Sequence, residues 1–130
     1  VALEAEARSH DDQSINKQVK HMKETFETTA NELGGQAEVL VEKSYPGFEV
    51  NETDKVTQYA ISSALALGLK GDTCIAGGGS DGNIMNQYGI PSVILGVGYE
   101  NIHTTSERIA IKDMYMLTRQ IIKIIELVAE

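Results

Sequence analysis

A glycine-rich turn and a lone histidine are the features of this 130-residue sequence that could support chemistry. Gly77, Gly78 and Gly79 precede the Ser-Asp-Gly turn that begins at Ser80, and His103 opens the run His-Thr-Thr further on. Glycine backbone leaves N–H groups accessible, so such a loop can bind a carboxylate or a polarised carbonyl. A neutral imidazole can serve as a metal ligand.

Each feature also has a structural interpretation. The glycines could simply permit a tight strand-to-helix turn with Ser80 or Asp81 as the helix cap, and His103 could be an ordinary surface histidine. The spacing also matches G-x-G-x-x-G, but the helix that follows is short and no acidic residue stands where ribose recognition needs one. The P-loop is excluded because Lys-Ser/Thr does not follow the last glycine. We therefore do not expect nucleotide binding.

Three other side chains are weaker candidates for a functional role. His10 lies at the end of an expected strand, and His21 lies off the apolar stripe of an expected helix. Cys74 is expected to be a buried strand residue and not a nucleophile. One cysteine cannot form an internal disulfide, which fits a reducing compartment.

The composition is that of a globular protein, with 42% hydrophobic and 23% charged residues. The net charge of −8 leaves no basic surface, so nucleic acid is not an expected partner. We find neither a signal peptide nor an apolar segment long enough to span a bilayer, and we predict a cytoplasmic protein that does not bind membranes.

The N-terminal third predicts a β-α-β unit. Residues 1–8 alternate apolar and charged side chains, residues 15–33 carry an apolar stripe at helical spacing, and residues 36–45 are rich in Val and Leu. Asp11 or Asp12 can cap the helix, and the glycines at 34 and 35 can end it. The connection implies two parallel strands with a right-handed crossover.

The rest of the chain alternates helix and strand. Helices are expected at 52–68 and 112–129, and buried strands at 73–77 and 91–98. This alternation predicts a three-layer α/β sheet, with a domain boundary near residues 45–51. The glycine loop and His103 both follow strands, so they should meet at the carboxyl edge of the sheet, where such folds bind ligands.

These motifs resemble a known enzyme family. The run "GGGSDGNIMNQYGIPSVILGVGYENIHTTSERIAI" is similar to the C-terminal signature of the di-zinc exopeptidases, which include peptidase T-like tripeptidases, carboxypeptidase G-like enzymes, aminoacylases and desuccinylases. The sequence motifs "ARSHD" and "GVGYENIHTTSE" most resemble those of the peptidase T-like group. The resemblance implies that residues 1–46 are the second half of an α+β, ferredoxin-like lid or dimerisation domain. Residues 47–130 would be the C-terminal part of the catalytic domain, so we expect a fragment.

The resemblance also implies roles for individual residues. His103 corresponds to the last metal ligand of a site that holds two zinc ions, while the other ligands and the general base are expected to precede this segment. Gly78, Gly79 and Ser80 would line the substrate site, and Arg8 would reach the terminal carboxylate of a short peptide, which suits its guanidinium fork. No catalytic residue is assigned within the segment.

Two of these assignments have open alternatives. Arg8 could instead pair with an acidic neighbour, namely Glu4, Glu6 or Asp11. Glu107 could orient His103 or cap the local turn.

Two hypotheses from different classes follow. The parent protein could be a zinc-dependent aminopeptidase, or an aminoacylase or deacylase of the same family, of which this segment alone is inactive. Alternatively, the chain could be a non-catalytic lid and scaffold module. In either case, we expect a homodimer formed through the lid.

Overall fold

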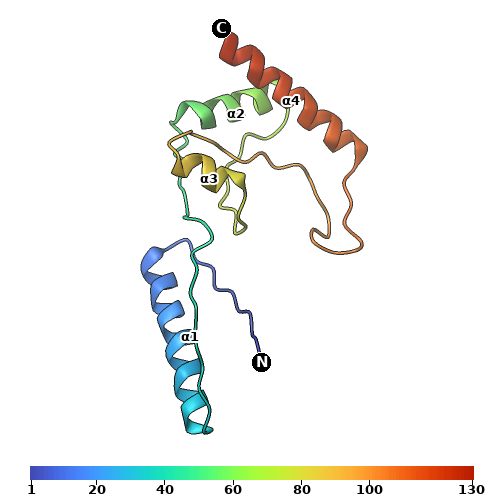
Figure 1. Cartoon of the computed structure of the whole chain (residues 1–130). Helices are drawn as coiled ribbons and strands as arrows, with labels where there is room; N and C mark the ends of the chain where they lie inside the picture. Colours follow the sequence, from blue (N-terminus) through green and yellow to red (C-terminus); the bar gives the residue numbers. More distant parts are fainter. The chain divides into compact units, whose positions relative to one another are not determined.

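The computed structural model describes residues 1–130 and contains four helices joined by loops and turns (Figure 1). These are α1 (Asp12–Glu32), α2 (Lys55–Ala66), α3 (Asp81–Gln87) and α4 (Ile111–Ala129). Helices α1, α2 and α4 lie where the apolar periodicity predicts helices, and α3 is the short helix expected after the glycine loop. None of the helices combines the length and the hydropathy needed to cross a bilayer.

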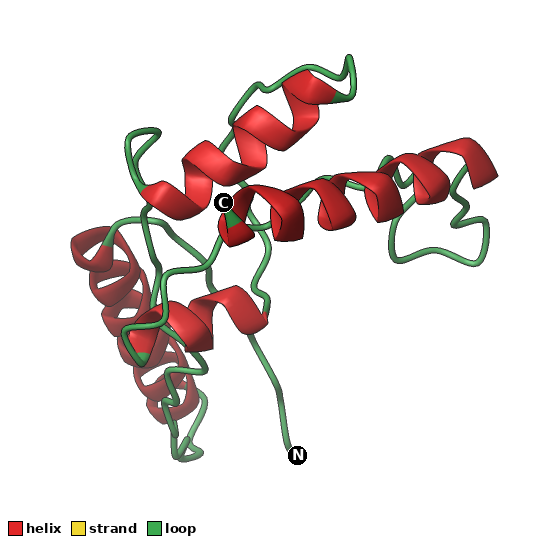
Figure 2. Cartoon of the chain, turned by 90° about the horizontal axis from the view of Figure 1, so that it is seen from above, coloured by secondary structure: helices red, strands yellow, loops and turns green.

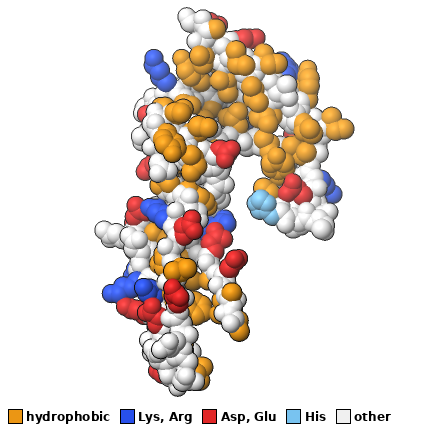
Figure 3. All heavy atoms as spheres, viewed as in Figure 1, with side chains coloured by type: hydrophobic (Ala, Val, Ile, Leu, Met, Phe, Trp, Pro, Cys, Tyr) orange, Lys and Arg blue, Asp and Glu red, His pale blue; other side chains and the backbone are white.

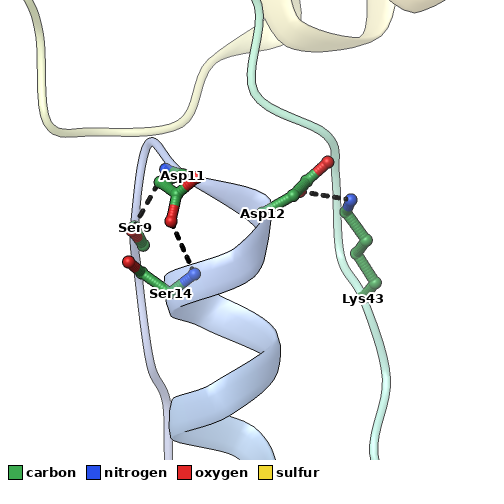
Figure 4. A network of polar contacts seen from close by, with 5 residues as sticks. All are labelled: Ser9, Asp11, Asp12, Ser14 and Lys43. Carbon is green, nitrogen blue, oxygen red and sulfur yellow. Dashed lines mark hydrogen bonds and ion pairs between the residues drawn. The ribbon is translucent and has the colours of Figure 1, made fainter.

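Helix α1 begins and ends at the predicted signals. Asp11 has an extended backbone, and its side chain accepts a hydrogen bond of 2.6 Å from the backbone N–H of Ser14 (Figure 4). At the other end, Gly34 has a φ of 76°, and the N–H of Gly35 donates to the carbonyl of Ala30 at 2.8 Å. A left-handed glycine at this position is a common way to end a helix. The predicted cap and the predicted end are both confirmed.

The cap should make α1 sensitive to acid. The pKa of Asp11 lies below its ordinary value because Ser14 donates side-chain and backbone hydrogen bonds to the carboxylate. A carboxyl with a lowered folded-state pKa stabilises the fold above the unfolded-state pKa, and this stabilisation is lost as the pH falls through the folded value. We therefore expect the helical content of α1 to decrease below about pH 4.

Circular dichroism from pH 7 to pH 2 can measure this loss. Asp11→Asn keeps an oxygen acceptor without the titrating charge, so its acid-induced loss of helix should be smaller than that of the wild type. Equal acid sensitivity of the two proteins would contradict the assignment.

Helices α2 and α4 pack against each other and form the most buried part of the chain. Ser63 is fully buried and Ala64 is 4% exposed, both on α2. Gln120 of α4 is also buried, and its Nε2 donates to the carbonyl of Ala60 at 3.2 Å. Small side chains on α2 let the two helices approach closely, and the Gln120 amide satisfies a buried polar group.

The predicted strands form no sheet, and the α/β class is not confirmed. Figure 2 shows helices and loops without a strand, and the only β-type pairing is an isolated antiparallel bridge between Glu100 and Arg108. The predicted strand segments find no neighbouring strand in this chain with which to exchange backbone hydrogen bonds. Cys74 is consequently exposed, which corrects the expectation that it is buried, and Ile75 beside it is 85% exposed.

The chain divides into two compact units. Unit 1 is Val1–Gly47 with Gly77–Gly79, and unit 2 is Phe48–Ala76 with Ser80–Glu130. Within unit 1, residues 1–9 and 36–45 both run opposite to α1 (Figure 1), which is the chain direction that the β-α-β prediction requires. The assignment of the two units as lid and catalytic domains stays a prediction.

Large apolar side chains are exposed in both units. Leu3 is 74% exposed and Leu40 is 87% exposed in unit 1, and in unit 2 Ile111 is 84% exposed. Figure 3 shows hydrophobic side chains spread over the surface around α2 and α4. So much exposed apolar surface is characteristic of a surface that another chain segment or partner covers.

Candidate functional site

His103 lies in a closed loop that runs from Glu100 to Arg108 in unit 2. Both backbone hydrogen bonds of the bridge join these two end residues, at 2.9 and 3.1 Å. The guanidinium of Arg108 also binds the carboxylate of Glu100, with its Nε at 2.7 Å and its Nη2 in contact with the same oxygen. The ends of the loop are therefore fixed, and His103 lies exposed near its middle.

The backbone of His103 is left-handed, with a φ of 64°. Non-glycine residues seldom adopt this conformation, and such outliers cluster at functional sites. The backbone N–H of His103 donates to Oε2 of Glu107 at 2.7 Å. Glu107 thus holds the backbone of the histidine, a contact that is compatible with both of the roles predicted for it.

The glycine segment Gly77–Gly79 belongs to unit 1 and is exposed. Atoms added as Cβ at Gly77 or Gly78 would meet nothing within 4 Å, so these two positions are open. At Gly79 an added Cβ would lie 2.7 Å from Cε1 of Tyr45 and would clash with the rest of the phenol tip. A side chain at this position would therefore have to displace the ring of Tyr45.

Ser80 is the N-cap of α3 and belongs to unit 2. Its Oγ accepts from the N–H of Gly82 at 3.2 Å and also from the backbone N–H of Asn83, while its own N–H donates to Oδ1 of Asn83 at 2.9 Å. The reciprocal bonds between Ser80 and Asn83 form a capping box. The predicted capping role of Ser80 is confirmed, and no hydrogen bond joins Ser80 to His103.

Arg8 pairs with Glu6, one of the three acidic neighbours considered from the sequence, through Nε and Oε1 at 2.5 Å. The hydrogen bond and the opposite charge of Arg8 lower the pKa of Glu6, and the same two interactions raise the pKa of Arg8. The Tyr45 side chain adds a smaller electrostatic contribution to the raised pKa of Arg8. Both side chains of the pair are well exposed, so a negatively charged ligand could replace Glu6.

Two residues near these positions were not predicted as important. Tyr45 lies against Gly79, a predicted site residue of unit 1, and its side chain contributes electrostatically to the raised pKa of Arg8. Asn86 of α3 binds the loop that follows it, since its Nδ2 donates to the carbonyl of Ser92 at 2.9 Å and its Oδ1 accepts from the N–H of Ser92 at 3.2 Å. Sequence spacing gave no signal for Tyr45, because the contact joins distant segments.

The chain contains no group of three His, Cys, Asp or Glu side chains arranged to hold a metal ion. His103 could donate one nitrogen, but hydrolytic zinc sites use three protein ligands. The donor set of this chain therefore fits a contribution to a metal site and not a complete site.

A family model described as "Peptidase family M20/M25/M40" matches residues 5–127. An uncharacterized protein of Bacillus subtilis, YqjE, is 40% identical over 126 residues, which are 97% of this chain and 34% of that protein. The chain thus spans about a third of the length of this relative.

Two solved structures are also similar. The crystal structure of a tripeptidase from Staphylococcus aureus is 60% identical, with a TM-score of 0.84 over 93% of this chain and 32% of that one. The crystal structure of the aminopeptidase PepT from Bacillus cereus is 42% identical, with a TM-score of 0.75 over 92% of this chain and 32% of that one. The resemblance to peptidase T-like enzymes is confirmed.

Proposed function

The chain belongs to peptidase family M20/M25/M40, and on that premise we propose that it is the C-terminal third of a zinc-dependent aminopeptidase that hydrolyses short peptides. The observation that carries the proposal is the 60% identity to a tripeptidase over nearly the whole chain. Because the chain spans 32% of that enzyme, the activity is assigned to a longer protein that contains this sequence, called here the parent enzyme. The segment alone is proposed to be inactive.

The same premise gives the extended segments a role. Segments 1–8 and 36–45 are proposed as strands of a lid domain, and segments 73–77 and 91–98 as strands of a three-layer catalytic domain. Their pairing partners are proposed to lie in the part of the parent enzyme that this chain does not span. The exposed side chains of Leu3, Leu40 and Ile75 support this, because strands that complete a sheet and a core would bury them. A homodimer through the lid is proposed on the same grounds.

His103 is proposed as a ligand of one of two zinc ions. Peptidases of this family are generally metal-dependent, and the exposed imidazole on a closed loop fits one donor of a site completed outside this chain. Two bound zinc ions would activate a water molecule and polarise the scissile carbonyl. The contribution of this chain is the fixed backbone that presents the imidazole nitrogen.

Arg8, Gly78, Gly79 and Ser80 are proposed to bind the substrate. The guanidinium of Arg8 suits a terminal carboxylate, which would replace Glu6 as its partner. The hydroxyl of Ser80 already caps α3, so we assign substrate contact to the backbone of the glycine segment and Ser80. The exposed and open positions at Gly77 and Gly78 leave room for a peptide.

Arg8→Ala in the parent enzyme should raise KM for peptides with a free C-terminal carboxylate by about 10–100-fold, because it removes a charge-assisted contact to substrate. The turnover number should change less, and amidated peptides should be affected little. Lys43→Ala is a matched control, since Lys43 is an exposed cation of the same unit that pairs with Asp12 at 3.1 Å (Figure 4). Equal KM changes for free and amidated peptides would contradict the carboxylate assignment.

The proposed function is tested by comparing substrates. The purified parent enzyme should hydrolyse unmodified tripeptides faster than N-acetylated amino acids, and chelators should abolish the activity. Preference for N-acetylated amino acids would favour the aminoacylase alternative. A parent protein without hydrolytic activity on either substrate class would favour the lid and scaffold module. We also propose a cytoplasmic location, which the unpaired cysteine Cys74 supports.

A further inference from the structure

The loop around His103 is closed by contacts that are all local. The bridge and the ion pair join Glu100 to Arg108, and Thr104 bonds the carbonyl of Asn101 through its hydroxyl at 2.7 Å and its N–H at 3.2 Å. The N–H of Glu107 in turn donates to the carbonyl of Thr104 at 3.1 Å. The loop therefore has a defined backbone within which one side chain can be aimed.

The unusual backbone is localised at Asn101 and His103, with φ values of 52° and 64°. Asn and His occur in this region more often than most other non-glycine residues, but it still costs more than the right-handed conformation. A left-handed His103 is therefore stabilised by any contact that favours this backbone. The 2.7 Å bond from its N–H to the carboxylate of Glu107 is the contact made directly by the strained residue.

We propose that Glu107 is a positioning residue that holds His103 in the left-handed conformation and so fixes the direction in which the imidazole points. This inference rests on the proposed role of His103 as a zinc ligand. Glu107 acts through the backbone N–H, and the Glu100–Arg108 pair supports it by closing the loop. A histidine that is already oriented loses less freedom when it binds metal.

The mechanism predicts a difference between two substitutions. Glu107→Gln keeps a carbonyl oxygen that can accept from the His103 N–H, whereas Glu107→Ala removes the acceptor. If Glu107 acted by its charge on the imidazole, both substitutions would be equally harmful. Backbone positioning therefore predicts that glutamine is tolerated better than alanine.

The test measures zinc affinity of the parent enzyme by competition with a chelator. We expect Glu107→Ala to weaken zinc binding about tenfold, as outer-shell partners typically do, and Glu107→Gln to weaken it less than about threefold. Visible absorption of the cobalt-substituted enzyme should be altered in the alanine variant, because ligand geometry sets that spectrum. Glu126→Ala is the matched control, since Glu126 is an exposed glutamate of unit 2 that pairs with Lys123 at 3.0 Å.

Arg108→Ala is a second variant in case Glu107→Ala does not fold. Its ion pair with Glu100 is well exposed, so the expected weakening of zinc binding is smaller, about threefold. Zinc affinity that is unchanged in Glu107→Ala, or in Arg108→Ala where the first variant does not fold, would overturn the proposal. So would equal losses in Glu107→Gln and Glu107→Ala. His103→Ala distinguishes failure of the proposed zinc-ligand role of His103 from failure of the positioning role of Glu107. Unchanged zinc affinity in that variant would refute the metal role of His103, and with it this inference.

Discussion

His103→Ala lowers peptide hydrolysis by the parent enzyme by more than about a hundredfold at low zinc, if the proposed ligand role is right. Loss of an outer-shell partner already costs about 10–100-fold in metal affinity or activity, and a direct ligand should cost more. Because the loss arises from weakened metal binding, raised zinc should restore part of the activity by mass action. Turnover measured across a zinc titration tests both expectations.

His21→Ala is the matched control for this substitution. His21 is an exposed histidine on α1 and has no proposed role, so its replacement should leave turnover unchanged and alter stability by only about 0.5 kcal/mol. A His103→Ala enzyme with near-normal turnover at low zinc would remove the metal assignment. Lost turnover without any rescue by zinc would point to a different role for the imidazole.

Ala64→Asp should destabilise unit 2 by about 3–5 kcal/mol, the cost of an uncompensated buried charge. Ala64 is 4% exposed and lies on α2, the helix that packs against α4. A stability loss of this size is comparable with the whole stability of a small domain. We expect the variant to lose most of its cooperative unfolding transition in urea, followed by circular dichroism.

Ala66→Asp provides the comparison for this prediction. It introduces the same side chain in the same helix at an exposed position, where the cost should stay within about 1 kcal/mol. Similar losses in the two variants would show that helix propensity dominates and not burial. The α2–α4 contact would then contribute little to stability.

The helices could be predicted from the sequence because their signals are local. Asp11 as a cap, Gly34 as a terminator and apolar residues at helical spacing act within a few positions of the chain. Strands differ, since their hydrogen bonds depend on partner strands that are often distant in the sequence. The segment around Cys74 has the composition of a buried strand, yet composition alone cannot supply the neighbour that would bury it.

The candidate site was predictable only where its signals are local in the sequence, as they are for the helices. His103 was identified from its motif, and the structure adds the left-handed backbone that no spacing rule indicates. Glu107 had two interpretations, and the spacing alone did not predict its bond to the His103 N–H. Tyr45 was missed because its contact with Gly79 joins residues that are distant in the sequence.

Unit 1 is built from two separate chain segments, which limits how it can be expressed on its own. Three glycines of this unit, Gly77–Gly79, are separated in sequence from the remainder of it, Val1–Gly47. A truncation after Gly47 would therefore yield a peptide in which Tyr45 has no Gly79 to lie against. Adding the missing segment in trans, or grafting it through a new linker, would supply the glycines again, whereas a simple expression boundary does not include every residue of the unit.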